Sequence, residues 1–390
     1  MIQFDFHLPV ASIILLGLAL AALAYICLVY CRRLWRLRRH KRLCDSGDRQ
    51  VDTLSLPWAS VIVYARGDSE SLARHLPAML EQDYMPGYEV IVVNDGSEEE
   101  VSMAVKLLRN TYPNIYLTFT PDGARNLSRK KLALTLGVKA AKGEAVVITD
   151  ATTKVNSDRW LVSMMSPLAD PDVDIVLGYG RPAARGFLTK QFDLAADSAA
   201  WLLSALSGKT YRACGSNLAY RRQAFFDNKG FSRSLNLRNG DDDIFVSEIA
   251  QGRGVAVEMS QDSIVDIEVP AFARWAKEFR RAHMFTGRRL AKGSRRIMAA
   301  GEWCLWLVPL LAAAGAWLAG PYNAVGWIAA LLLTVAAWTV PAIAWSGLLR
   351  SLGVKARGIA LPLMAMARPL RNTYAAVRAR LSHGHYSWQK

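Results

Sequence analysis

A short apolar run at residues 145–149 (AVVIT) ends abruptly at Asp150 and limits the fold of this chain more than any other segment. Helix-like segments lie on both sides of it, at residues 130–141 and 158–168. A run of β-branched and small apolar residues between two helices is typical of a strand buried on both faces of a parallel sheet. Because ligands bind at the carboxyl ends of such strands, Asp150 lies where a functional site is expected.

The same alternation of strands and helices extends over the segment from residue 58 to residue 179. Strands are predicted at residues 58–65, 88–93, 115–119, 145–149 and 174–179, and helices at residues 69–82, 101–110, 130–141 and 158–168. This order predicts an α/β fold with a doubly wound, mainly parallel sheet. The alternation stops after residue 179, so we expect the second half to form a wall on the acceptor side rather than more of the same sheet.

Membrane segments account for the overall composition. The chain has 390 residues, 52% of them hydrophobic, which is too apolar for an ordinary soluble enzyme. Residues 8–31 form an apolar run of about the length that crosses a bilayer as a helix, and residues 303–318 and 324–345 form two more. We therefore expect transmembrane helices at both ends of the chain.

The positive charges predict how the chain lies in the membrane. Residues 1–7 contain no basic residue, whereas residues 32–42 (RRLWRLRRHKR) form a basic juxtamembrane helix, and the tail from Arg350 is basic again. Since basic loops stay in the cytoplasm, we expect a multi-pass protein of the inner (cytoplasmic) membrane whose globular part faces the cytoplasm. The net charge of +15 fits contact with anionic membrane lipids, and no zinc-finger or RNA-recognition pattern indicates nucleic-acid binding. The five cysteines are scattered, without a metal-binding or disulfide pattern.

These features predict five segments. They are an N-terminal transmembrane anchor with a basic segment (1–45), a cytoplasmic globular domain (55–270), an amphipathic interfacial helix region (271–300), a transmembrane hairpin (301–347) and a basic cytoplasmic tail (348–390). The interfacial region combines arginines with Trp275, Phe279 and Phe285, a mixture typical of a helix that rests on a membrane surface.

Acidic residues recur where the predicted strands end. Arg66 and Asp68 follow the first strand, and residues 94–97 (NDGS) follow the second. Each motif alone more often indicates only a turn and a helix cap. Residues 240–243 (GDDD) place three carboxylates before a predicted helix at residues 244–250. Three adjacent acids exceed what capping requires, and their repulsion is costly unless one has a function or a cationic partner.

Taken in order, these motifs resemble the family 2 glycosyltransferases. The resemblance rests on residues 65–68 (ARGD), 93–97 (VNDGS), 130–134 (KKLAL), 149–151 (TDA), 214–221 (CGSNLAYR) and 240–243 (GDDD), within a span of roughly residues 57–290. Each motif is weak, but the ordered set is specific. The resemblance implies a GT-A fold and an inverting enzyme that uses nucleotide sugars.

The resemblance also implies roles for individual residues. Asp242 matches the general base of the family, and Asp241 lies beside it. Asp150 matches the first acid of the DxD motif, which contacts the nucleotide and its metal. The positions implied for donor binding are Arg66, Asp68, Asp95, Lys130, Lys131, Asp150 and Asn217. Among them, Asp68 and Asp95 match positions that hold uracil and ribose, and Lys130 or Lys131 would lie near the diphosphate.

Two positions depart from the family pattern. Thr152 replaces the second acid of DxD, so the implied Mg²⁺ or Mn²⁺ would be held by Asp150, the diphosphate and water. The family's QxxRW motif corresponds here to residues 278–282 (EFRRA), in which Arg281 keeps a cation for the leaving diphosphate but the tryptophan is missing. Trp275 lies one helical turn earlier, and packing in an interfacial helix is the simpler interpretation of it.

The sequence predicts an inverting transfer of a sugar from a nucleotide sugar, chiefly a UDP-sugar, to a hydroxyl of a glycan or lipid-linked acceptor. Within the same class, the alternative is a processive exopolysaccharide synthase that works with partner subunits of a polysaccharide assembly system. Outside that class, the alternative is a catalytically inactive scaffold that binds sugar nucleotides. Replacing Asp242 by Asn separates the classes, because only an enzyme should lose turnover.

Overall fold

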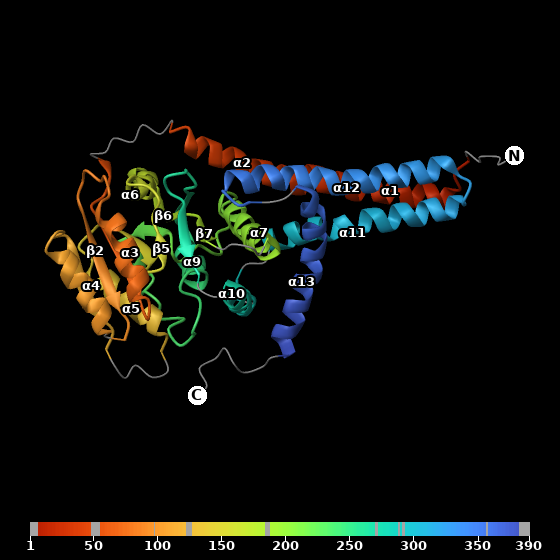
Figure 1. Cartoon of the computed structure of the whole chain (residues 1–390). Helices are drawn as coiled ribbons and strands as arrows, with labels where there is room; N and C mark the ends of the chain where they lie inside the picture. Colours follow the sequence, from red (N-terminus) through yellow and green to blue (C-terminus); the bar gives the residue numbers. More distant parts are fainter. Residues whose placement is uncertain are drawn as a thin grey trace. The chain divides into compact units, whose positions relative to one another are not determined.

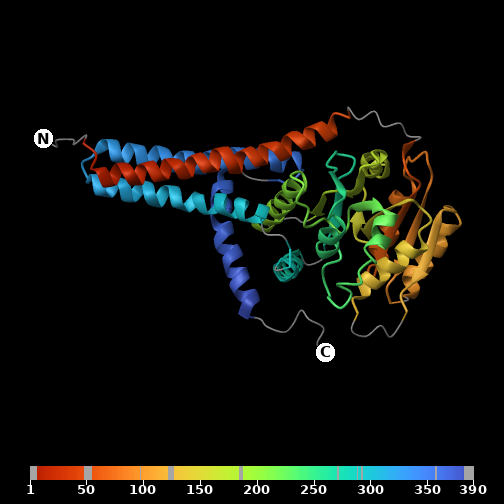
Figure 2. The same cartoon turned by 180° about the vertical axis from the view of Figure 1, so that it is seen from behind.

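A computed structural model describes residues 7–47, 55–96, 98–121, 127–183, 188–269, 272–287, 289–290, 293–355 and 358–381. The chain divides into two compact units (Figures 1 and 2). A helical unit contains Met1–Arg39, Leu188–Leu203 and Lys292–Val377, and a sheet unit contains His40–Phe187, Ser204–Ala291 and Arg378–Lys390. Ser97 of the NDGS motif, Arg288 and residues 382–390 of the basic tail lie outside the described residues.

The sheet unit is built on a seven-stranded sheet whose strand order is β3-β2-β1-β4-β8-β6-β9. These strands are β1 (Ala59–Ala65), β2 (Tyr88–Asn94), β3 (Ile115–Phe119), β4 (Ala145–Asp150), β6 (Val173–Leu177), β8 (Leu218–Arg221) and β9 (Gly254–Val257). The first four pair in parallel, and β8 lies antiparallel between β4 and β6. The predicted α/β fold with a mainly parallel sheet is confirmed.

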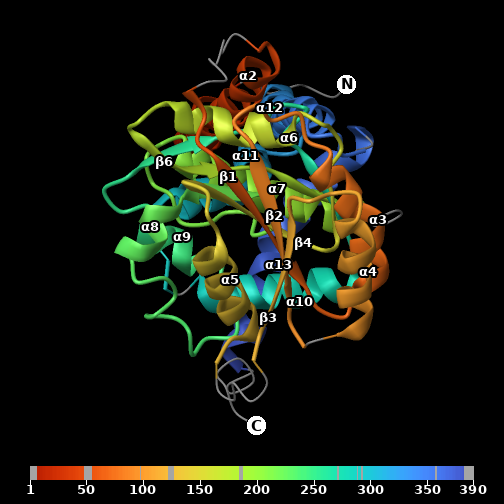
Figure 3. The same ribbon diagram turned by 90° about the vertical axis from the view of Figure 1, so that its left-hand side faces the viewer.

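Helices cover both faces of the parallel strands. They are α3 (Ser69–Leu80), α4 (Glu99–Arg109), α5 (Arg129–Ala140) and α6 (Trp160–Met165), the last continued by a short 3₁₀ turn, Ser166–Ala169. Figure 3 shows α3 and α4 on one side of the sheet and α5 on the other. Alternate residues of β1 divide between the two faces: Val61 and Val63 belong to the core beneath α3, α4 and α6, whereas Ile62 meets α5 at Gly137.

The second half of the chain completes the sheet, contrary to the prediction from the broken alternation. The short strands β8 and β9 join it, and a small second sheet of order β5-β10-β7 forms beside it. The strands of this second sheet are β5 (Thr153–Lys154), β7 (Gly180–Ala183) and β10 (Val265–Glu268), and the sheet unit also contains α8 (Arg222–Asp227), α9 (Ile244–Ile249) and α10 (Phe272–Thr286). Strands of four residues carry too little periodicity to be recognised in the sequence.

The helical unit contains all three predicted apolar segments. Its helices are α1 (Val10–Tyr25), continued through a π-helical turn (Ile26–Cys31) into α2 (Arg32–Asp45), then α7 (Leu188–Ala205), α11 (Gly293–Ala319), α12 (Ala324–Ser351) and α13 (Leu361–Leu381). Among the residues that the structure describes, three helices are long and apolar enough to cross a membrane: Val10–Asp45, Arg296–Ala319 and Ala324–Ser351. Neither α7 nor α13 was predicted, and α13 lies in the part of the chain expected to be a basic tail.

Small residues let the membrane helices pack closely. Ala19 of α1 forms a buried cluster with Ala312 and Ala316 of α11 and with Ala330 of α12. The hydroxyl of Ser12 donates a 2.6 Å hydrogen bond to the carbonyl of Gly315. Small side chains at helix interfaces are the usual means of close packing in membranes. These contacts hold α1, α11 and α12 together as one bundle.

Candidate active site

Three predicted site residues lie at the carboxyl ends of neighbouring parallel strands. The strand register places Asp150 of β4 opposite Tyr64 of β1, and Asn94 of β2 opposite Ala65 of β1. Asp95 follows β2 directly, and Asp68 begins α3 just beyond β1. The sheet therefore gathers side chains at one edge from parts of the chain that are far apart in sequence.

Asp95 is fully buried and satisfied by protein groups. Its Oδ1 accepts hydrogen bonds from Thr120 Oγ1 (2.7 Å) and Arg129 Nε (2.8 Å), and its Oδ2 accepts one from the hydroxyl of Tyr64 (2.7 Å). Arg66 Nη1 lies 3.8 Å from Oδ2, and the Arg66 side chain is more than half exposed. The carboxylate thus holds two arginines and a tyrosine at the sheet edge.

The pKa of Asp68 is affected by two neighbouring carboxylates. Burial raises its pKa, and the carboxylates of Asp150 and Glu98 raise it further. Glu98 accepts a 2.6 Å hydrogen bond from the backbone N–H of Gly67, whose φ of +65° favours glycine. The two predicted donor-binding acids Asp68 and Asp150 therefore share one electrostatic environment.

Lys130, at the start of α5, joins two parts of the site. Its ammonium lies 2.9 Å from Asp150 Oδ1 and 3.3 Å from Asp241 Oδ2, and 5.3 Å from the centre of the Tyr64 ring. Burial alone would lower the pKa of Lys130, but Asp150 and Asp241 outweigh it and raise that pKa well above its ordinary value. Lys130 is therefore a fixed positive charge between the strand-end acid and the acidic GDDD motif.

The other oxygen of Asp150 is held by a serine. Ser216 Oγ donates a 2.5 Å hydrogen bond to Asp150 Oδ2, and the Ser216 carbonyl accepts a 3.0 Å hydrogen bond from Thr149 Oγ1. Thr152 follows in the next turn, and its carbonyl accepts a 2.8 Å hydrogen bond from Glu268 N. Asp150 thus has a fixed orientation, with a hydroxyl residue rather than a second acid two positions later.

The three acids of the GDDD motif have different surroundings. Asp243 is buried, caps α9 through a 2.6 Å hydrogen bond from Ile244 N, and accepts hydrogen bonds from Thr286 Oγ1 and from Arg212 Nη2 (3.4 Å). Asp241 pairs with Lys130. The surroundings of Asp242 change its pKa. Burial and the negative charges of Asp241 and Asp243 raise that pKa well above the ordinary range, although the positive charges of Arg212 and Lys130 oppose the shift.

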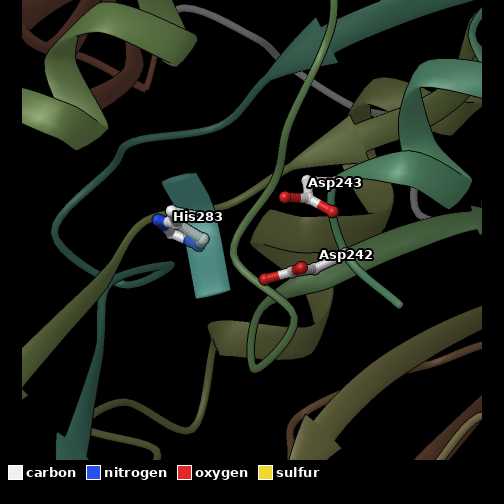
Figure 4. Close-up of side chains that lie close together, drawn as sticks. All are labelled: Asp242, Asp243 and His283. Atoms are coloured by element: carbon white, nitrogen blue, oxygen red, sulfur yellow. The ribbon is translucent and has the colours of Figure 1, made fainter. Parts of the chain in front are cut away.

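His283 of α10 lies next to this acidic motif. Asp242, Asp243 and His283 each offer one ligand atom, and these atoms lie within 4.8 Å of one another (Figure 4). Both oxygens of Asp243 already accept hydrogen bonds from Ile244, Thr286 and Arg212. This geometry suits Asp243 for positioning α9 and α10 better than for holding a metal ion.

Of the two adjacent lysines, only Lys130 points to the acids. Lys131 is fully buried, and its ammonium donates to the carbonyls of Ser234 (2.7 Å), Asn239 (2.9 Å) and Leu237 (3.2 Å). Burial lowers its pKa. Lys131 therefore fixes the loop that leads into the GDDD motif.

Asn217 and Arg281 lie in different settings. The Asn217 side chain is buried; its Oδ1 accepts a 3.0 Å hydrogen bond from Trp160 Nε1, and its Nδ2 donates to the carbonyls of Ser263 (2.8 Å) and Tyr179 (3.1 Å). Arg281 is half-buried on α10, two residues before His283. Asn217 thus joins the segments around β8, whereas Arg281 lies on the helix that carries His283.

Sequence reasoning missed several residues of this site. Ser216 belongs to the segment 214–221 (CGSNLAYR), and its position next to Asn217 was the signal that could have identified it. Arg129 precedes the predicted lysine pair. Arg212 and His283 lie far from the acids in sequence and belong to no motif, so only the fold brings them to Asp243 and Asp242.

Comparison with known proteins agrees with this geometry. The family described as Glycosyl transferase family 21 matches the chain over residues 15–389. The chain belongs to that family. It is therefore a nucleotide-sugar-dependent glycosyltransferase with a GT-A fold; the family that matches is family 21, and the resemblance of its motifs to family 2 stays a prediction.

Two known proteins are similar to this family 21 glycosyltransferase, one in structure and one in sequence. The mannosyltransferase PcManGT from Pyrobaculum calidifontis, solved in complex with GDP-Man and Mn²⁺, matches with a TM-score of 0.58 and 21% identity over 95% of this chain and 100% of that one. Glycosyltransferase AglE from Haloferax volcanii is 24% identical over 127 residues, which are 32% of this chain and 40% of AglE. The match thus spans less than half the length of AglE.

Proposed function

We propose that this family 21 enzyme transfers a sugar, with inversion, from a UDP-sugar to a hydroxyl of a glycan or lipid-linked acceptor. The main observation behind the proposal is that one lysine forms ion pairs with two separate groups of acids. Lys130 lies between Asp150, at the strand end, and Asp241, beside Asp242. One side of the site thus suits a nucleoside diphosphate, and the other side holds a carboxylate suited to remove a proton.

Asp242 is the proposed general base. An inverting transfer requires a carboxylate that takes the proton of the acceptor hydroxyl as the bond to the anomeric carbon forms. The raised pKa of Asp242 brings its proton affinity closer to what that task needs than that of an ordinary exposed aspartate. Asp241, paired with Lys130, and Asp243, paired with Arg212, keep Asp242 crowded by negative charge.

We propose that some of the remaining predicted donor residues contact the donor directly and that others shape its binding site. Arg66 and Asp68 lie at the sheet edge where the nucleoside would bind, and Lys130 faces the diphosphate. Asp95, Lys131 and Asn217 are engaged with protein groups, so we propose that they shape the donor site. Arg281 is the proposed second cation for the leaving diphosphate.

Asp150 is the proposed ligand of a hard divalent cation, which would displace Lys130 or Ser216 from one of its oxygens, because both oxygens are engaged in this structure. Asp150 is fixed by Ser216 and Lys130, and such ions commonly complete their coordination with water and substrate phosphate. Bound there, Mg²⁺ or Mn²⁺ would neutralise charge on the departing diphosphate. Mn²⁺ binding in the presence of UDP, measured by electron paramagnetic resonance, should weaken in an Asp150→Asn variant even if no turnover is followed.

The membrane helices support an acceptor presented at the bilayer. We propose that the segments 1–45 and 301–347 anchor the enzyme in the inner membrane, with the domain 55–270 in the cytoplasm, the region 271–300 at the interface and residues 348–390 on the cytoplasmic side. Membrane lipids, and partner subunits of a polysaccharide assembly system, would then surround the site. The three apolar helices of the described segments are few for a polymerase that also builds an export channel, so we favour single or limited transfer.

The test is release of nucleoside diphosphate by the full-length protein in detergent. UDP- and GDP-sugars are offered with membrane lipid extract, with and without Mg²⁺ or Mn²⁺. We expect release from a UDP-sugar, and a loss of about 10²–10⁴-fold in turnover for Asp242→Asn with donor binding retained, the range typical of a lost general base. Asp172→Asn, at an exposed turn, is the matched control.

Two outcomes would contradict the proposal. If no sugar nucleotide is turned over although one binds, the chain is a binding scaffold. If Asp242→Asn works as well as the Asp172→Asn control, Asp242 is not the base. Release from GDP-sugars alone would change the donor class and leave the chemistry intact.

A further inference from the structure

Beyond the transfer reaction, the structure contains a helix that the sequence did not predict, and its surroundings indicate what it binds. Helix α13 belongs to the helical unit up to Val377 and runs across the long axis of the α11–α12 hairpin (Figures 1 and 2). Its charged residues are all arginines, at positions 368, 371, 378 and 380. A helix of this composition is unusual in a unit that otherwise consists mainly of membrane helices.

A buried ionic network holds one face of α13. Arg368 pairs with Glu302 of α11 and with Asp197 of α7, and Arg371 donates to both oxygens of Asp193 of α7 (2.6 and 3.0 Å). Arg368, Glu302 and Asp193 are all buried. Because these pairs are directional, they fix the rotation of α13 about its own axis as well as its position.

The position of α13 along α11 is also fixed. Trp306 Nε1 of α11 donates a 2.8 Å hydrogen bond to the carbonyl of Met366. Glu302 directly precedes the apolar run 303–318 of α11, and Trp306 is the fourth residue of that run. Helix α13 therefore crosses α11 near the start of this apolar run, at the level where a membrane surface is expected and where tryptophans are common.

The opposite face of α13 is an exposed apolar stripe. Leu363, Leu370, Tyr374 and Val377 are 67%, 48%, 65% and 47% exposed. They are separated by seven, four and three residues, which places them on one side of a helix, whereas Leu361, Met364, Ala365 and Arg368 are buried on the other. The ionic network thus turns this apolar stripe outward.

We propose that the α13 stripe (Leu363, Leu370, Tyr374 and Val377) binds the lipid surface of the membrane, with α13 lying in the plane of the leaflet. Two features on the same unit favour lipid over a protein partner. The helix crosses the hairpin at the start of the apolar run 303–318, and it contains no acidic residue that would repel anionic headgroups. The acids that could repel such headgroups, Glu302, Asp193 and Asp197, are paired with its arginines.

Photo-crosslinking in a bilayer tests this assignment directly. The full-length protein, carrying p-benzoylphenylalanine in place of Tyr374 or Leu370, is placed in nanodiscs of phosphatidylethanolamine and phosphatidylglycerol and irradiated. Tyr374 is already aromatic, so its replacement disturbs the fold least. Leu331 on α12 and Met85 in the sheet unit, 63% and 75% exposed, are the lipid and water reference positions.

We expect lipid adducts at positions 374 and 370 in a yield comparable to that at position 331, and at most traces at position 85. Cross-linked dimers at position 374 would identify a second copy as the occupant and overturn the proposal. Adducts at position 331 without any at positions 370 and 374 would show that the stripe faces water, and would overturn it as well. Either result leaves the proposed transfer reaction untouched.

Discussion

At the scale of single residues, the proton affinity of the site is set by a cluster of carboxylates of which two share one lysine. Asp150, Asp241, Asp242 and Asp68 lie in one region, and Lys130 contacts two of them. An arrangement of this kind is costly without a cationic ligand or a proton. The donor-free site therefore holds a proton on Asp242 more firmly than an ordinary aspartate would.

Lys130→Met should move the pH dependence of turnover. Lys130 lowers the pKa of Asp242, so removing it raises that pKa further. The base must be ionised to act, so the acidic limb of kcat should shift to higher pH, while Lys130→Arg should leave it close to the original. The pH profile of nucleoside diphosphate release at saturating donor is the measurement. If the acidic limb of Lys130→Met were unchanged, Lys130 would not influence the pKa of Asp242.

Asp242→Asn should stabilise the fold at neutral pH. The raised pKa means that the folded state binds this proton more tightly than the unfolded chain does. Stability is therefore lost as pH rises from the ordinary aspartate pKa of about 3.9 through the raised pKa of the folded state, by about 1.4 kcal/mol for each pH unit that separates the two values. Thermal unfolding in detergent should show a higher Tm for the variant at pH 7 and nearly equal values near pH 4. A lower Tm at pH 7 would contradict the assignment.

Site residues could be predicted from the sequence only where the residues next to them in the chain form a recognisable pattern. Asp150 was found because a buried strand ends there, and the GDDD motif because three acids are adjacent. The sequence could not separate Lys130 from Lys131, since both start the same helix and differ by the rotation of about 100° between successive residues. That rotation directs Lys130 to the acids and buries Lys131 against backbone carbonyls.

At the scale of elements, the site is held together by short segments from the second half of the chain. Strand β8 supplies the Ser216–Asn217 turn at its start, and α9 presents Asp242 and Asp243 at its beginning. The long elements β1, β2, β4, α3 and α5 were predicted because their periodicity extends over several turns or alternations. Elements such as β8 and β9 depend on pairing with strands already in place, which no local pattern records.

Asn217→Ala should destabilise the sheet unit. The change leaves the Trp160 indole N–H and the carbonyls of Tyr179 and Ser263 without their partner in a buried setting. We expect a loss of roughly 2–4 kcal/mol, as is usual when several buried polar groups lose their hydrogen bonds. Asn114→Ala, which removes a single 3.4 Å hydrogen bond to Tyr88, is the matched control for chemical denaturation.

The same experiment distinguishes two roles of Asn217. If the variant unfolds at the same denaturant concentration as the control but loses donor affinity, Asn217 contacts the donor directly. If stability falls and the residual folded protein binds donor normally, its role is to join β8 to its neighbours. The hydrogen bonds of Asn217 favour the second outcome.

At the scale of the whole molecule, the two units are interleaved along the chain. The helical unit takes Leu188–Leu203 from the middle of the sequence, and the sheet unit continues after it. Composition predicted the apolar spans, because their length and hydropathy are local properties. It could not predict α7 or α13, whose place in the unit rests on ion pairs between residues 193–197, 302 and 368–371.

Arg368→Met should destabilise the helical unit by about 3–5 kcal/mol, because it leaves Glu302 buried without its partner. Adding Glu302→Met should restore much of the loss, since two apolar side chains then replace a buried pair. Arg350→Met, at an exposed position of α12, is the control. Thermal unfolding in detergent measures the effect; a double variant that is no more stable than Arg368→Met alone would contradict the pairing.

The interleaving has a consequence for synthesis on the ribosome. One edge of β4 lacks its neighbour until β8 has been made, and the segment between them includes α7, whose acids Asp193 and Asp197 find their arginines only near the end of the chain. A nascent or truncated chain that stops before Arg368 therefore lacks the ion pairs that join α7 to α13. We expect α7 to reach its final position in the helical unit only after Arg368 and Arg371 have been made, so that a helix from the middle of the sequence is fixed by residues translated about 170 positions later.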